Sequence, residues 1–72
     1  MNDRQLRRAF EVSCVTYGFC ISTAAREEIA KRSDLDAKMF ARLVVEAEGL
    51  DATNCEWTST LEEVFRDSAQ RP

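Results

Sequence analysis

The chain has 72 residues, a length that allows one domain with a small hydrophobic core. Its 44% hydrophobic and 32% charged residues are typical of a folded globular protein and exclude a disordered chain. No apolar run approaches the ~18 residues that a membrane span needs, and the net charge of −3 argues against a nucleic-acid partner. We therefore expect residues 1–72 to form a single small domain.

Hydrophobic periodicity predicts an all-α domain with three or four helices. Asn2 or Asp3 can cap a first helix that runs to about Tyr17, because their short side chains accept bonds from free backbone N–H groups. Gly18 interrupts this helix, and a second, shorter helix is predicted over residues 24–32. The predicted fold is a compact helical bundle.

The strongest prediction is a helix near residues 34–48, which we place in the centre of the domain. Ser33 or Asp34 can cap its first turn, and Gly49 can end it in the left-handed conformation. At ~100° per residue, its apolar side chains form one broad arc that should face the core. The members of this arc are Ala37, Met39, Phe40, Leu43, Val44 and Ala47.

Val45 falls outside this arc, on the charged side of the same helix. Single apolar residues on a surface are common and need no function. Alternatively, Val45 and Ala41 mark a surface that faces a partner protein. Together with the neighbouring cations Lys38 and Arg42, they are our candidate partner-binding residues.

The sequence is compatible with more than one start for the last helix. The candidate starts are Thr53 or Asn54, and later the capping boxes Ser59–Glu62 and Thr60–Glu63. Trp57 is the chain's one tryptophan. As the largest aromatic side chain it can fill the core, but an exposed Trp57 would indicate a binding surface, where tryptophan is enriched.

The chain offers little catalytic chemistry. It has no histidine, which excludes catalysis by an imidazole base, and no glycine-rich phosphate loop. Its three cysteines are an odd number without a CxxC spacing, so we expect neither a disulfide nor a metal site. The N-terminal arginines are not followed by an uninterrupted apolar core, so we expect no secretory signal. These features predict a cytoplasmic protein that is not an enzyme and binds no cofactor.

The string EEIAKRSDLDAKMFARLV resembles a helix-turn-helix motif, with residues 27–46 supplying the two helices. Asp34 stands where the motif usually has a turn glycine, and Ser33 replaces the apolar residue before it. The resemblance implies a DNA-binding transcriptional regulator. Its groove-facing positions would be Asp36, Ala37, Lys38, Ala41, Arg42 and Val45.

Charge is unevenly distributed along the chain. Residues 1–32 carry a net charge of +2 and residues 33–72 a net charge of −5, so the two halves can attract each other within one fold or across a homodimer. Arg4, Arg7 and Arg8 form a small basic group near the start. By elimination, the leading hypothesis is a protein-interaction module: a small inhibitor, adaptor or regulatory subunit. An exposed apolar patch would favour it, whereas one continuous basic surface would favour the DNA-binding alternative.

Overall fold

The computed structural model describes residues 1–54 and 56–71, and this part of the chain is helical without a strand. The elements are α1 (Asp3–Tyr17), α2 (Thr23–Ala30), α3 (Ala37–Ala47), the short 3-10 helix η1 (Ala52–Asn54) and α4 (Trp57–Gln70). The predicted all-α fold is confirmed. Among the described residues, no helix is long and apolar enough to cross a membrane.

The first helix begins and ends as its sequence predicts. The Asn2 side chain accepts a hydrogen bond from the backbone N–H of Gln5 (2.8 Å), and the Gln5 side chain accepts one from the backbone N–H of Asn2 (2.9 Å). This reciprocal pair is a capping box. At the other end, Gly18 has a φ of 81°, a left-handed conformation that glycine adopts without steric cost.

The third helix begins later than expected. Its N-cap is Asp36, whose side chain accepts a hydrogen bond from the backbone N–H of Met39 (2.8 Å), so the predicted caps Ser33 and Asp34 were wrong. Both lie in the connector before the helix, which also carries the half-buried Leu35. Leu35 packs on the core from this non-helical connector, and the helix starts after it.

The last helix also departs from both predicted starts. It begins at Trp57, after a cap residue, Glu56, that makes no side-chain capping bond. The Asp51 side chain accepts two hydrogen bonds from Thr53, from its backbone N–H (2.9 Å) and its hydroxyl (2.7 Å). These bonds lower the pKa of Asp51 and support the turn that leads into η1.

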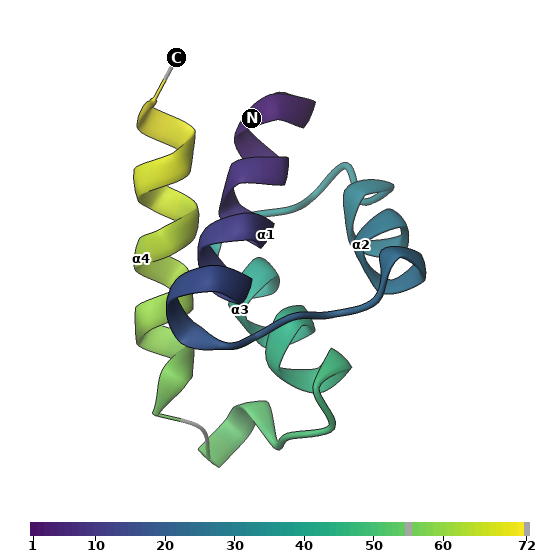
Figure 1. Cartoon of the computed structure of the whole chain (residues 1–72), viewed down its shortest axis with the longest axis vertical. Helices are drawn as coiled ribbons and strands as arrows, with labels where there is room; N and C mark the ends of the chain where they lie inside the picture. The colour runs from purple at the N-terminus through teal and green to yellow at the C-terminus, as the bar shows by residue number, and fades with distance from the viewer. Residues whose placement is uncertain (55, 72) are drawn as a thin grey trace.

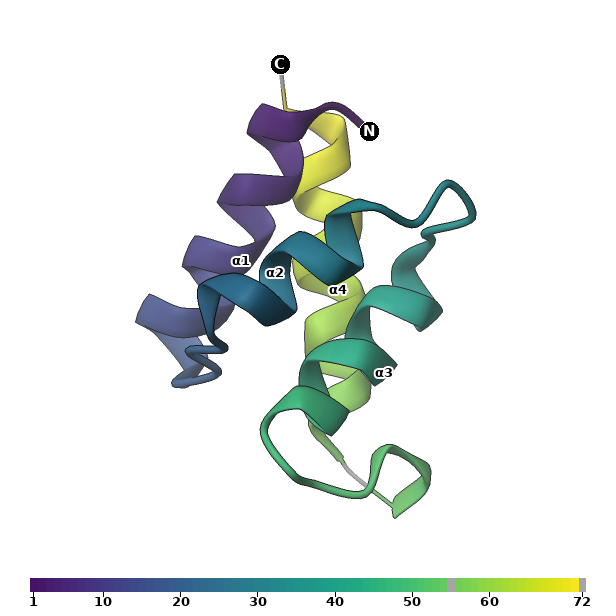
Figure 2. The same cartoon turned by 90° about the vertical axis from the view of Figure 1, so that its right-hand side faces the viewer.

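The helices α1 and α4 lie side by side and antiparallel, with both chain ends at the same end of the molecule (Figure 1). The Gln5 side-chain amide donates to the backbone carbonyls of Ala69 (3.0 Å) and Arg71 (2.8 Å), which ties the start of α1 to the end of α4. Figure 2 shows α2 crossing in front of α4, and Figure 1 places the two on opposite sides of the molecule. The third helix packs on α2, α4 and η1.

Three phenylalanines from three helices meet at the centre of the core. The Phe40 ring of α3 is fully buried, 5.5 Å from the Phe10 ring of α1 and 5.2 Å from the Phe65 ring of α4 (centroid distances). Such tilted aromatic pairs add stability beyond the area that they bury. The third helix is therefore the central one, as predicted.

The face by which α3 meets the core differs from the predicted arc. Val45 and Ala41 are 0% and 1% exposed, so the prediction that they lie on an exposed charged side was wrong. The true buried face comprises Ala37, Phe40, Ala41, Val44 and Val45. It is rotated by roughly 80° around the helix axis from the predicted arc, toward Ala41 and Val45.

Candidate partner-binding edge

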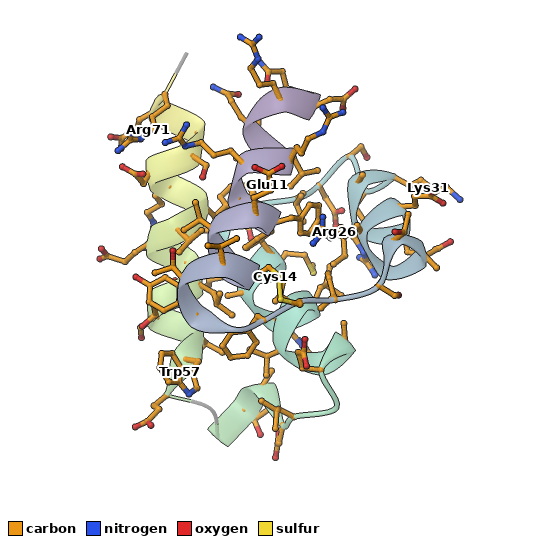
Figure 3. The ribbon with its side chains drawn as sticks, in the orientation of Figure 1. Glu11, Cys14, Arg26, Lys31, Trp57 and Arg71 are labelled. Carbon is orange, nitrogen blue, oxygen red and sulfur yellow. A yellow bond between two sulfur atoms is a disulfide. The ribbon has the colours of Figure 1, made fainter. Side chains whose placement is uncertain are left out.

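Large apolar side chains gather at the end of the molecule opposite the chain termini. The rings of Tyr17 (37% exposed) and Trp57 (40% exposed) lie 6.1 Å apart between centroids. The buried Phe19 ring lies 5.9 Å from Trp57, edge to face. We call these three residues the aromatic edge. Figure 3 shows Trp57 at the start of α4, far from Arg71 at its other end.

Helix ends hold the aromatic edge in place. Tyr17 is the last residue of α1, and Trp57 is the first residue of α4. Between Tyr17 and Phe19, the chain reverses at Gly18, whose N–H donates to the Cys14 carbonyl (3.0 Å). The N–H of Phe19 donates to the Ser13 carbonyl (2.9 Å), which completes a Schellman-type cap. This cap therefore fixes the backbone at Tyr17 and Phe19, from which two of the three rings project.

A groove of about 560 Å³ between α1 and α4 opens beside the aromatic edge. Its apolar lining comes from Val12, Tyr17 and Val64. Its polar lining comes from α4 and includes two carboxylates, Glu63 and Asp67. The groove is thus open, with a mixed apolar and polar lining and two carboxylates on its α4 side, and it is large enough for several side chains of a partner.

The structure contains a disulfide that the sequence analysis did not expect. Cys14 on α1 is bonded to Cys20 in the following connector, with their Cα atoms 4.2 Å apart. The expectation failed because the reversal at Gly18 returns the chain to α1, which sequence spacing alone does not show. The bond faces the viewer in Figure 3, and Cys20 is exposed. Cys55 lies outside the described residues.

The four predicted partner-binding residues do not form one surface. Ala41 and Val45 are buried, so a partner cannot reach them while the fold is intact. Arg42 is exposed, but its Nε lies 3.3 Å from a Glu46 carboxylate oxygen on the same helix. Lys38 is exposed one helical turn before Arg42 and lines a groove between α3 and α4.

The structure of α2 and α3 also departs from the geometry of a helix-turn-helix motif. The connector between α2 and α3 spans residues 31–36, longer than the 3–4-residue turn that is usual in the motif. Of the positions expected to face a DNA groove, Ala37, Ala41 and Val45 are buried, and Asp36 caps α3. The DNA-binding alternative stays a prediction without a structural feature in its favour.

The basic group near the start is exposed and mixed with carboxylates. Arg7 lines a groove between α1 and α2 together with three acidic residues, Asp3, Glu11 and Glu27. Arg26 lies in the same groove with its guanidinium carbon 5.7 Å from the Phe10 ring centroid (Figure 3). Alternating charges of this kind give no continuous positive surface there. Within the described residues, no cluster of cysteine and acidic side chains could hold a metal ion.

Sequence reasoning missed the aromatic edge because it treated its members separately. The sequence indicates Tyr17 only as the approximate end of the first helix, and it allows Trp57 to be either a core residue or an exposed one. One signal was available: Tyr17 directly precedes the breaking glycine, and Trp57 follows a segment rich in turn-forming residues.

No protein-family model matches the chain, and neither a characterised protein nor a solved structure is detectably similar to it.

Proposed function

We propose that this chain is a non-catalytic protein-interaction module that binds a partner protein at the aromatic edge and the adjoining α1–α4 groove. One observation carries the proposal: the exposed Tyr17–Trp57 ring pair, which two helix ends hold in place over the buried Phe19. Tryptophan and tyrosine supply large contact areas at low cost in conformational entropy, and they dominate binding hot spots.

The other exposed large apolar side chains lie outside the aromatic edge and the groove. Val15, on the last turns of α1, is 84% exposed, but two residues before Tyr17 on the same helix place it on a different face. Two further exposed apolar residues, Met1 (51%) and Leu50 (48%), are in other parts of the fold and line no part of this groove. An exposed apolar patch away from α3 is the feature that we expected of an interaction module.

The experiment is a selection of 16-residue random peptides displayed on phage against the immobilised protein. We expect wild type to enrich peptides that the Trp57→Ala variant does not retain. Leu50→Ala is the matched control, because it removes an exposed apolar side chain of the fold outside the aromatic edge. Circular dichroism and urea unfolding would establish that both variants are folded.

Two outcomes would overturn the proposal. The first is the absence of enrichment on wild type, and the second is enrichment that Trp57→Ala retains. Sedimentation of the free protein tests whether a second copy already occupies the edge. If the free protein is a dimer and Trp57→Ala dissociates it, the partner at the aromatic edge is a second copy of this chain.

A further inference from the structure

We propose that the Cys14–Cys20 disulfide is a redox-sensitive switch: it holds the aromatic edge in its binding conformation, and a dithiol reductant weakens partner binding by opening it. This inference rests on the proposed function and adds the regulation of the same site. Three observations carry it: which residues the bond encloses, how few other bonds hold their segment, and the exposure of one of the two sulfurs.

The disulfide closes a short loop that contains two of the three residues of the aromatic edge. Tyr17 and Phe19 both lie between the two cysteines in the chain. Cys14 is three residues before Tyr17, so these two side chains are neighbours on the surface of α1. Cys20 directly follows Phe19, whose ring meets Trp57 edge to face at 5.9 Å. The bond therefore restrains the segment from which both rings project.

Few other bonds hold this segment against α1. The hydrogen bonds of the α1 cap come from the N–H groups of Gly18 and Phe19 and extend no further. Within residues 1–54 and 56–71, the N–H groups of Cys20 and Ile21 donate no hydrogen bond, and the chain is next fixed at Ser22, which caps α2. After reduction, the two cap bonds and the burial of the Phe19 and Ile21 side chains are what keeps the segment closed. Local opening then becomes more frequent, because no cross-link limits the detached segment.

The bond is accessible to a reductant. Cys20 is exposed, and the two sulfurs face the viewer in Figure 3. One thiolate of a dithiol attacks the Cys20 sulfur, the Cys14–Cys20 bond breaks, and Cys14 leaves as a thiolate. The second thiolate of the reductant attacks its own sulfur in this mixed disulfide, which releases Cys20 and closes a disulfide in the reductant. Two electrons pass to the protein, and the two protons of the dithiol end on Cys14 and Cys20.

Reduction weakens binding through a loss of preorganisation. In the oxidised protein the Phe19 ring is already in place under Trp57 before a partner arrives. In the reduced protein the partner has to select the closed segment, which costs conformational entropy on binding. The cost of ordering one freed side chain corresponds to an affinity about three- to tenfold lower.

The chain's one tryptophan reports the state of the edge without any partner. The protein for this experiment is Cys55→Ser, which removes the third thiol. Acrylamide quenching of Trp57 fluorescence is measured before and after dithiothreitol, and thiol titration shows when the bond has opened. Trp57 is 40% exposed in the oxidised protein, so we expect reduction to raise the quenching constant up to about twofold.

The second measurement is the affinity of a labelled peptide that the phage selection enriches on the oxidised protein, followed by fluorescence anisotropy. We expect dithiothreitol to weaken its binding about three- to tenfold and reoxidation to restore it. The matched control adds Cys14→Ser and Cys20→Ser to the same background. It should show the quenching and affinity of the reduced protein, with and without dithiothreitol.

Four outcomes would overturn the inference. Two free thiols before reduction would mean that no bond forms, and unchanged quenching after the bond has opened would mean that it does not restrain the edge. Loss of the helical circular dichroism signal on reduction would mean global unfolding rather than a local switch. Unchanged peptide affinity would remove the regulation and leave the proposed function standing. A selection that enriches no peptide refutes the proposed function itself, even where quenching responds to reduction.

Discussion

Val45 gives the sharpest test of the fold, because its burial is the largest departure from the sequence prediction. Val45→Ala removes two methyl groups from a side chain that is 0% exposed. At about 0.8 kcal/mol for each buried carbon, the lost transfer free energy is about 1.6 kcal/mol, and the residual cavity adds to it. Alanine is the better helix former by about 0.5 kcal/mol, which offsets part of this loss. We expect the free energy of unfolding to fall by about 1.5 to 2 kcal/mol.

The chain offers a matched control in Val15, which has the same side chain on a helix but is 84% exposed. Val15→Ala keeps the gain in helix propensity without the loss of packing, so stability should stay constant or rise by up to about 0.5 kcal/mol. Urea unfolding followed by circular dichroism measures the free energy of unfolding of both variants. Their m-values should be the same. Equal effects at the two positions would refute the orientation of α3.

Two further predictions concern the disulfide and the α3 cap. In a Cys55→Ser background, reduction should lower the free energy of unfolding by about 2 kcal/mol, because the Cys14–Cys20 bond closes a short loop in the unfolded chain. Thermal unfolding with and without dithiothreitol measures this, and identical melting curves would mean that no such bond forms in the protein. Asp36→Ala should cost about 1 kcal/mol through loss of the cap on Met39, whereas the exposed Asp34→Ala should cost nothing measurable. Equal effects in urea unfolding would show that Asp36 is not the cap.

The helices could be predicted from the sequence because their signals are local. Asn2 and Gly18 bound α1 as expected, and Gly49 follows α3 with a φ of 81°. The orientation of α3 could not be predicted, since apolar residues surround most of this helix. Met39 and Leu43 are as apolar as Val44 and Val45, and only the positions of the neighbouring elements decide which of them are buried.

The candidate site was less accessible to sequence reasoning than the fold. The aromatic edge joins Tyr17 to Trp57 across 40 positions of the chain, and it exists because α1 and α4 pack antiparallel. No local sequence pattern predicts a contact between residues that far apart in the chain. The Cys14–Cys20 bond was not predicted either. The two sulfurs come together only because the helix cap reverses the chain at Gly18.

The bonds from Gln5 to the last turn of α4 have a practical consequence for handling the protein. They hold the two ends of the chain together at the pole opposite Trp57 (Figures 1 and 3). A fluorophore, a surface tether or a carrier domain attached to either terminus therefore extends away from the rings. The molecule can be immobilised from the side of Asn2 or of Arg71 in the same orientation, with the aromatic edge turned outward.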